Sequence, residues 1–343
     1  LSGAGSVTAS VLNLFSGGLS GTGDLTVTNN FTQTGGSVGS LYQNLSLTHV
    51  GNFTVGNYSA QNSLKLVASG GSLLINDVSL GAPSVSLSGA NVILKPTTTA
   101  GSFVDSTNLT VSTPGALVLD GSNGPAKLQS AGTMDLTVGS VNVTAGAFAA
   151  SIDPTTLNLT ATGDIVLGGG LGNNASALIS GNNISMSGAN IILNGGAGSG
   201  SFAVIEAMTG DASVSASNAI IMVPGPGANS DASILAPQGT LTITAAMCTG
   251  CITLGGNPLP SQNTDQGLFG STVVLNIPSP PPVEIDSTRI QTNSTAIQIV
   301  NSIYYANSLT VTGGQANTGY IQQPQDEQEE KKAETKEGKD TAT

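Results

Sequence analysis

Apolar and polar residues alternate through most of the chain, most clearly at residues 157–167, which read LNLTATGDIVL. Leu157 and Leu159 precede a short turn that contains Gly163, and Ile165 and Leu167 follow it. Successive side chains of a strand point to opposite faces, so these four apolar residues can all point inward. The stretch therefore predicts two short strands that meet at a bend.

The same pattern of two strands around a bend recurs along the chain. Copies begin at residues 45, 64, 85, 109, 184, 214 and 241 and read LSLTHVGNFTV, LKLVASGGSLLI, VSLSGANVIL, LTVSTPGALVL, ISMSGANIIL, VSASNAIIM and LTITAAMCTGCITL. The copies end about 25 residues apart, which is a period typical of solenoids.

Some copies carry a third apolar segment upstream, at residues 100–104, 145–149 and 200–204. Three short strands joined by two corners of unequal length describe one coil of a three-sided parallel β-helix. One coil cannot bury its apolar side chains alone, whereas stacked coils share one core. We therefore expect an all-β fold, a parallel β-helix of roughly 10–12 coils at this period.

The repeats divide the chain into three parts. Residues 1–277 are interpreted as β-helix repeats, and residues 278–320 as a proline-rich break followed by a terminal β coil or cap. Residues 321–343 contain DEQEEKKAETKEGKD, which offers no large apolar side chain and predicts a disordered charged tail. Because the first residues already resemble a repeat, we expect the chain to be a fragment of a longer protein.

Composition narrows the function classes. The chain of 343 residues has 46 glycines, 8% charged residues, 8 Lys and Arg residues and a net charge of −12. Phosphate binding depends on clusters of Lys and Arg, so we expect neither nucleic acid nor an anionic membrane surface as a partner. No run of 18 apolar residues is present, so we also expect no membrane span.

The repeats LNLTATGDIVL, VSLSGANVIL and ISMSGANIILNGG resemble the coils of filamentous-haemagglutinin-like exoproteins. These are large adhesins exported by two-partner secretion in Gram-negative bacteria. The resemblance covers most of residues 45–275 and implies a right-handed parallel β-helix that acts at the cell surface in adhesion or biofilm formation. It also implies an outer-membrane transporter as a partner during export. The family's amino-terminal export signatures contain Asn-Pro, and the only such pair here is Asn257-Pro258, far along the chain.

Cys248 and Cys251 form a CTGC motif between two strand-like segments. A thioredoxin-type pair precedes a helix, and zinc needs further ligands, so redox and metal chemistry are disfavoured. We expect a small disulfide that clamps a widened corner, with two buried free thiols as the alternative.

Other candidate groups predict no cofactor and no metal. His49 is interpreted as a turn residue beside Gly51, because catalysis by histidine needs positioned partners. Residues 169–174, GGLGNN, resemble a calcium-binding nonapeptide of β-roll proteins, but they form one copy with Asn where those sites use Asp.

Carboxylates could indicate an enzyme, since many parallel β-helices act on pectin. The aspartates are spread along the chain beside turn residues: Asp77, Asp105, Asp120, Asp135, Asp153, Asp164, Asp211 and Asp231. We expect them in turns, with Asp120 and Asp135 able to stack and Asp153 and Asp164 able to approach across a corner. No convergent cluster is evident, so we predict no catalytic residues.

Two further residue types are assigned structural roles. Phe103, Phe148 and Phe202 recur within the upstream segments and predict one aromatic column inside the helix. Asn residues in N-x-S/T sequences are expected to form ladders between coils: Asn44, Asn52, Asn108, Asn142, Asn158 and Asn183.

We therefore expect a secreted or cell-surface structural and adhesive exoprotein segment rather than an enzyme. It would bind a host-cell or surface receptor, or a polysaccharide, through extended β-helix faces and loops. One alternative is a β-helical polysaccharide lyase or hydrolase. Another is a self-assembling extracellular filament subunit that associates end to end.

Overall fold

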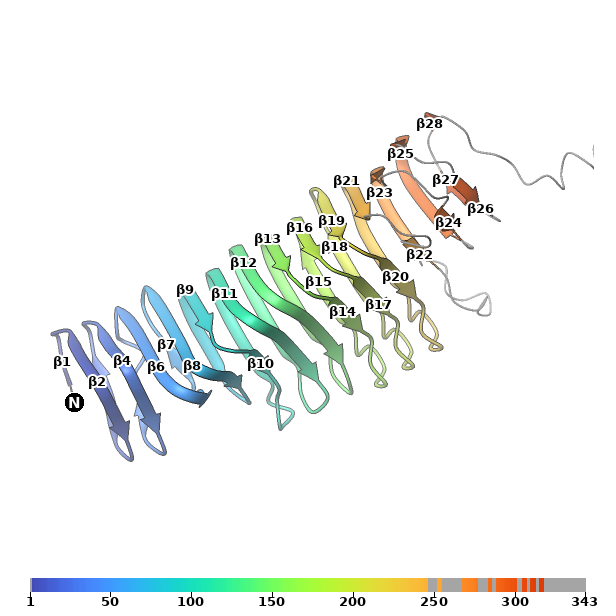
Figure 1. Cartoon of the computed structure of the whole chain (residues 1–343). Helices are drawn as coiled ribbons and strands as arrows, with labels where there is room; N and C mark the ends of the chain where they lie inside the picture. The colour runs from blue at the N-terminus through green and yellow to red at the C-terminus, as the bar shows by residue number, and fades with distance from the viewer. Residues whose placement is uncertain are drawn as a thin grey trace, which may run out of the picture.

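The chain forms a β-solenoid in which every strand pairing is parallel (Figure 1). This computed structural model describes residues 2–245 and, beyond them, strands β22 to β28; the described side chains are those of residues 4–245 and Leu268. No helix occurs in this part of the chain, and hence no helix there could cross a membrane. The expected parallel β-helix is confirmed. Cys248, Cys251 and the tail at residues 321–343 lie outside the described residues.

Three stretches of strand form the sides of each coil, and the long strands bend at corners to serve more than one side. The first side contains β2 (Val7–Leu14), β4 (Leu25–Gln33), β6 (Asn44–Thr54), β8 (Ser63–Ile75), β9 (Ser79–Ser88), β11 (Ser102–Gly121), β12 (Ala126–Ala145), β13 (Ala150–Ala161), β16 (Asn183–Gly188), β19 (Ala212–Ala216), β21 (Ala232–Ala245) and β23 (Gly267–Asn276).

The remaining strands complete the other two sides and the ends of the described chain. The second side adds β10 (Val92–Leu94), β14 (Ile165–Gly168), β17 (Ile191–Asn194), β20 (Ile220–Val223) and β22 (Ile252–Leu254), and the third adds β7 (Tyr58–Ser59), β15 (Ala177–Gly181) and β18 (Ala203–Ala207). Two small sheets contain β1 (Ser2–Gly3), β3 (Gly18–Gly21) and β5 (Ser37–Val38), and β24 (Val283–Ile285) and β26 (Tyr304–Ala306). Pairing continues from β23 to β25 (Thr288–Val300), β27 (Leu309–Thr312) and β28 (Gln315–Asn317).

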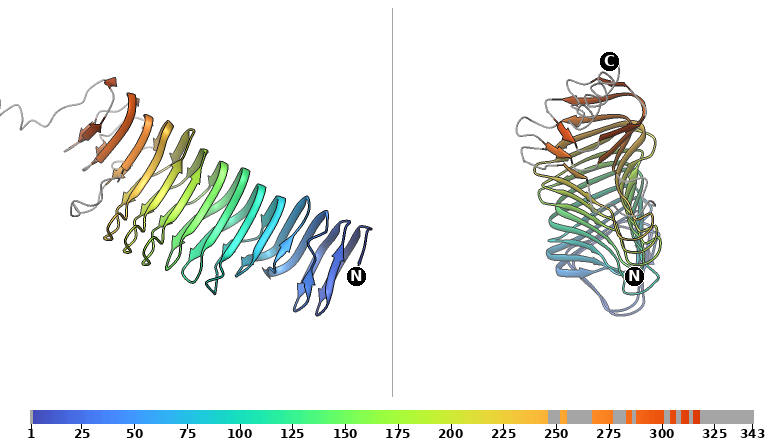
Figure 2. Two further views of the ribbon diagram at one scale, coloured as in Figure 1. Left: turned by 180° about the vertical axis from the view of Figure 1, so that it is seen from behind. Right: turned by 90° about the vertical axis from the view of Figure 1, so that its right-hand side faces the viewer.

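Residues of the same kind lie above one another in the stack, and Figure 2 shows the coils following one axis. One inward column on the first side runs through Val7, Leu25, Leu45, Leu64, Val85, Leu109, Met134, Leu157, Ile184, Ala212 and Leu241. From Leu25 onward its members are at most 2% exposed. The coil lengthens along this column, from 18 residues between Val7 and Leu25 to 29 between Ala212 and Leu241.

The stretch at residues 157–167 has the predicted arrangement. Leu157, Leu159, Ile165 and Leu167 are all buried. The bend lies between the end of β13 at Ala161 and the start of β14. Burial of one such side chain contributes about 1.5–3 kcal/mol, so the recurring pattern supplies the stability of the fold.

Buried hydroxyl groups satisfy the backbone where strands bend. The Ser130 hydroxyl donates to the carbonyl oxygens of Thr107 and Thr133 at 2.6 and 3.1 Å, and the Thr113 hydroxyl donates to that of Ala90 at 2.8 Å. The pairing of β11 with β12 shifts register on either side of residues 109–113. A buried carbonyl without a hydrogen-bond partner destabilises the fold, so these serine and threonine hydroxyls stabilise the corners.

The prediction that Phe103, Phe148 and Phe202 form one aromatic column inside the helix was wrong. Phe103, Phe148 and Phe202 are only half-buried, and they occupy different register positions: Phe103 pairs with Lys127, Phe202 precedes the paired Ala203, and Phe148 lies outside any strand. Although their flanking residues are similar, the three phenylalanines lie one to three positions apart in the register of the paired strands. A column forms only when each residue occupies the same register position in its coil, and similar flanking residues did not guarantee this.

The aromatic core lies instead in the amino-terminal coils. The buried Phe31 ring is 6.2 Å from the ring centres of both Phe53 and Tyr58, in edge-on geometry. Tyr58 donates to Gln33 Oε1 at 2.6 Å. Burial raises the pKa of Tyr58 to about 12, against a smaller lowering by the Gly56 backbone, so the phenol stays neutral and packed.

Three long corner loops stack on one another between the second and third sides. These loops, residues 169–176, 195–202 and 224–231, are called the glycine-loop stack here. Each closes with the same internal bond, as in Gly196 N to Ser201 O at 2.6 Å. Buried hydroxyls join the tiers: Ser201 Oγ donates to Gly172 O at 2.5 Å and Ser230 Oγ to Gly198 O at 2.6 Å. Only the first of these loops was singled out from the sequence, as residues 169–174.

We predict that Gly196→Ala destabilises the protein by about 1–3 kcal/mol, because a methyl group there would overlap the Gly170 carbonyl oxygen and force the tiers apart. The midpoint of urea unfolding, followed by circular dichroism, measures the effect. Ala197→Ser is the matched control on the exposed neighbouring residue, with an expected change within about 0.5 kcal/mol. Equal midpoints for both variants would contradict the close stacking.

Candidate functional site

The outward side chains of the first side form a nearly uniform polar surface, called the hydroxyl face here. Its central rank contains Thr8, Thr26, Ser46, Lys65, Ser86, Thr110, Asp135, Asn158, Ser185, Ser213 and Thr242. A second rank, two residues further along each strand, contains Thr48, Val67, Ser88, Ser112, Thr137, Thr160, Ser187, Ser215 and Thr244. Neighbours are about 4.8 Å apart along a rank and about 6.6 Å apart between ranks.

A third rank, two residues before the central one, contains mainly Asn, Asp, Ser and Thr. Its members are Asn44, Ser63, Ser84, Asn108, Thr133, Thr156, Asn183, Asp211 and Thr240. These residues precede the first inward residue of each strand, at the corner where the chain enters the face. The hydroxyl face is therefore three ranks wide and continuous from β6 to β21.

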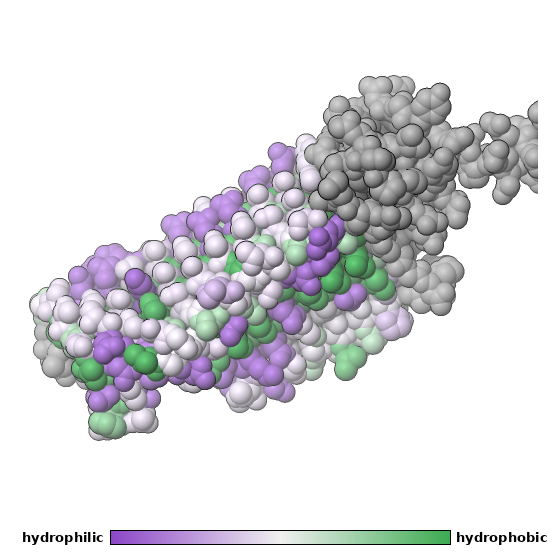
Figure 3. Space-filling model, in the orientation of Figure 1, coloured by the Kyte–Doolittle hydropathy of each residue, from purple (hydrophilic) through white to green (hydrophobic). Residues whose placement is uncertain are grey.

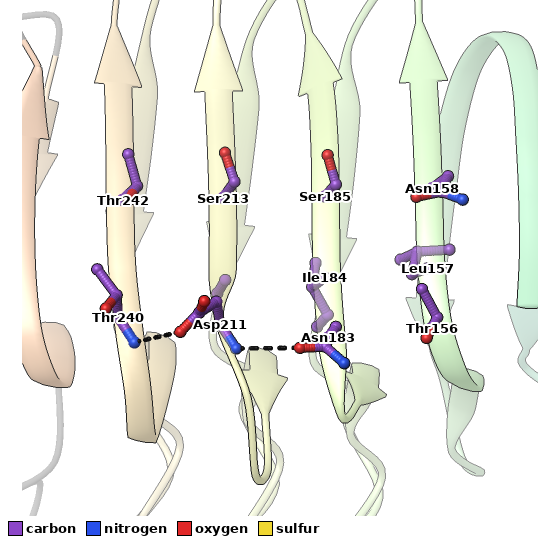
Figure 4. Close-up of a pocket in the computed structure, with 11 residues that line it drawn as sticks. Thr156, Leu157, Asn158, Asn183, Ile184, Ser185, Asp211, Ser213, Thr240 and Thr242 are labelled. Carbon is purple, nitrogen blue, oxygen red and sulfur yellow. Dashed lines mark hydrogen bonds between the residues drawn. The ribbon is translucent and has the colours of Figure 1, made fainter.

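A shallow groove of about 440 Å³ lies on this face across β13, β16, β19 and β21 (Figure 4). Its lining residues are Thr156, Leu157, Asn158, Asn183, Ile184, Ser185, Asp211, Ala212, Ser213, Thr240 and Thr242. They come from the third and central ranks, with buried residues of the inward column forming the floor. The groove crosses the strands, so its long direction follows the solenoid axis.

Hydrogen bonds between coils hold the acceptors of the groove in place. Asn183 Oδ1 accepts the Asp211 backbone N–H at 3.3 Å, and Asp211 Oδ1 accepts the Thr240 N–H at 2.8 Å (Figure 4). Asn158 Nδ2 donates to Asp135 Oδ1 at 2.8 Å, one coil earlier. Each bond leaves further hydrogen-bonding capacity on the side chain, namely the Asn183 amide N–H groups and the second Asp211 oxygen.

The central hydroxyls of the groove are free to bind. Ser185 and Ser213 are exposed and Thr242 is half-buried. None of the three hydroxyls bonds to another residue that the structure describes, and Figure 4 shows them in one row. A hydroxyl both donates and accepts, so the row can match a ligand that presents hydroxyl groups in series.

The second side presents a different surface. Its outward rank contains half-buried Leu74, Ile93, Val118, Val166, Ile192 and Ile221, with Asn142 between Val118 and Val166. Figure 3 shows apolar surface as green patches in the region of β14, β17 and β20. This rank offers few polar groups, so the hydroxyl face is the better candidate for polar recognition.

The carboxylates do not gather into a cluster within the described residues. Asp120 lies on the second side, paired with Thr144, whereas Asp135 lies on the first side, paired with Asn158, so the expected stacking of Asp120 on Asp135 is wrong. Asp120 forms an ion pair with Lys95 at 3.1 Å, and Asp153 forms one with Lys127 at 2.7 Å. No group of three or more His, Cys, Asp or Glu residues suited to a metal occurs between residues 4 and 245.

Several aspartates and asparagines instead accept hydrogen bonds from the backbone of the following coil. Asp164 Oδ1 accepts the Asn190 N–H at 3.2 Å and its Nδ2 at 2.7 Å, and Asn108 Oδ1 accepts the Thr133 N–H at 3.3 Å. Of the asparagines expected in ladders, Asn44, Asn52, Asn108, Asn158 and Asn183 all bond to an adjacent coil. Asn142 accepts instead from Thr144 on its own strand at 2.6 Å.

Two other candidates from the sequence, His49 and residues 169–174, contact the backbone of a neighbouring coil. His49 lies within β6 rather than in a turn, and its Nδ1 is 2.7 Å from Phe31 O; the turn assignment was wrong because Gly51 bends the strand without ending it. Asn173 and Asn174, in the calcium-like segment, belong to the first tier of the glycine-loop stack, where Asn173 Oδ1 accepts the Ser199 N–H at 3.2 Å.

Comparisons with protein-family models, with curated proteins and with solved structures find no match to this chain. The fold defines its class, a parallel β-solenoid. The resemblance to filamentous-haemagglutinin-like exoproteins stays a prediction that rests on the repeats.

The Asp77 carboxylate accepts five hydrogen bonds from the following coil and gives a prediction on pH. Asp77 has a φ of 53° and accepts bonds from the backbone N–H and hydroxyl groups of both Thr97 and Thr98. The Thr97 hydroxyl is the main cause that lowers the pKa of Asp77, the Thr98 N–H also contributes, and desolvation opposes them.

We predict that Asp77→Asn lowers the free energy of unfolding at neutral pH, since Asn tolerates positive φ but lacks the charge. A lowered folded-state pKa stabilises the fold above the unfolded-state value of about 3.9, and this contribution is lost as the pH falls through the folded-state pKa. Urea midpoints measured from neutral to acidic pH should therefore converge for variant and wild type. Asp105→Asn, on an exposed residue of β11, is the control, and its free energy of unfolding at neutral pH should lie within about 0.5 kcal/mol of the wild-type value.

Proposed function

We propose that this chain is a structural, adhesive segment of an exported surface protein, and that it binds through an extended face rather than through chemistry. The observation that supports this most directly is the continuity of the hydroxyl face from β6 to β21. Inward residues fill the core, corner residues bond to the next coil, and the outward ranks are left as a regular contact surface. A long repeated surface suits many weak contacts with a large partner.

The groove favours binding over catalysis. Glycoside hydrolysis uses two carboxyl groups on either side of the scissile bond. Asp211 is the one carboxylate among the groove residues, and one of its oxygens already accepts a backbone bond. The other polar groups of the groove are hydroxyls and amides, which bind and orient but are weak acids and bases.

We further propose that the chain belongs to the filamentous-haemagglutinin-like adhesins and acts outside the cell, at a bacterial surface, after export through an outer-membrane transporter. The repeats quoted above and the parallel solenoid support this assignment. The scarcity of Lys and Arg supports a partner that is neither nucleic acid nor an anionic membrane.

Surface retention tests the proposal. The purified full chain would be passed over immobilised polysaccharides, extracellular-matrix proteins and whole bacterial surfaces, with heat-unfolded chain as the control. We expect the folded chain alone to be retained on at least one surface, with no new reducing ends or unsaturated products released from polysaccharide. Retention on none of them would contradict the adhesive role, and released products would show a lyase or hydrolase instead.

A further inference from the structure

The geometry of the groove points to a specific class of ligand: we propose that it binds a neutral, linear polysaccharide whose chain runs along the solenoid axis. This inference rests on the proposed adhesive function and names the ligand of one site on the hydroxyl face. The contact residues are Asn183, Ser185, Asp211, Ser213 and Thr242.

The groove combines fixed and free hydrogen-bonding groups. Asn183 and Asp211 are held by backbone N–H groups of the following coils at 3.3 and 2.8 Å, so their remaining donors and acceptor point from defined positions. Ser185 and Ser213 add exposed hydroxyls one coil apart. Groups held in position before binding lose little entropy on binding. A sugar, which presents hydroxyls that both donate and accept, matches this mixture.

The direction and the polymeric nature of the ligand follow from the stacking. Groove residues lie on four strands that are neighbours in the sheet. The same ranks continue on the preceding coils through Thr110 and Asp135. The polar ranks therefore continue past the groove toward the amino-terminal coils. Their pattern repeats about every 4.8 Å. A ligand that repeats its hydroxyls along its length can use several coils at once. Each contact is weak, so binding strength should grow with chain length.

Charge decides in favour of a neutral polymer. Within the three ranks of the hydroxyl face, Asp135 and Asp211 lie in or beside the groove, whereas the one cation, Lys65, lies several coils away. Like charges repel, so an acidic polymer such as polygalacturonate would be disfavoured there. None of the described residues that line the groove is aromatic, so hydrogen bonding, rather than ring stacking, has to supply the affinity.

Affinity electrophoresis of the full chain tests the inference, in native gels that contain a soluble neutral glucan or mannan, or polygalacturonate. We expect neutral polymer to retard the wild type and polygalacturonate to leave it unaffected. Replacing two groove hydroxyls, in the double variant Ser185→Val and Ser213→Val, should weaken binding about tenfold, from the loss of two hydrogen bonds. Thr242→Val provides an independent second variant with a smaller loss.

The matched control is Thr54→Val with Ser79→Val, which replaces two exposed hydroxyls on the second and third sides, away from the hydroxyl face, and should leave binding unchanged. Far-UV circular dichroism verifies that each variant is folded. Equal weakening by both double variants would overturn the groove as the site, and stronger retardation by polygalacturonate would overturn the neutral ligand. If no polymer retards a chain that surfaces still retain, this inference fails while the adhesive function stands.

Discussion

Parallel pairing in register between one coil and the next is the constraint on which the rest of the structure depends. Each strand bonds to the equivalent strand of the following coil, so a residue type that suits one level is placed above the same type at the next. Inward columns of Leu, Ile and Val follow directly, and so do the outward ranks of Ser and Thr. The hydroxyl face and its groove are thus consequences of the register that builds the core.

The register also explains how a chain with few charges holds its corners. Asp77, Asp164, Asn108 and Asn183 each accept backbone N–H bonds from the coil that follows. Glycine serves the same purpose where backbones approach closely, as at Gly196 above Gly170. These contacts occur in coils of different lengths, because the corners absorb added residues while the strands keep their pairing.

Much of the fold could be predicted, because a period-two alternation reports directly on which side chains are buried. Leu157 and Leu167 were placed correctly on that basis. The register of the third side could not be predicted: Phe103 and Phe202 have similar neighbours but different strand positions. The groove was also missed, since Ser185, Ser213 and Thr242 are ordinary residues locally and become a site only through stacking. Alignment of the outward positions by coil would have revealed their row.

Distances between spin labels on the central rank of the hydroxyl face test the register most directly. Cysteines would be introduced in pairs, in a background with Cys248 and Cys251 replaced by Ser, and measured by double electron–electron resonance. At about 4.8 Å per coil, Ser86 with Ser213 should give about 24 Å, Ser86 with Thr242 about 29 Å and Thr26 with Thr242 about 43 Å. Distances that fail to increase by this constant step would contradict the stacked parallel coils.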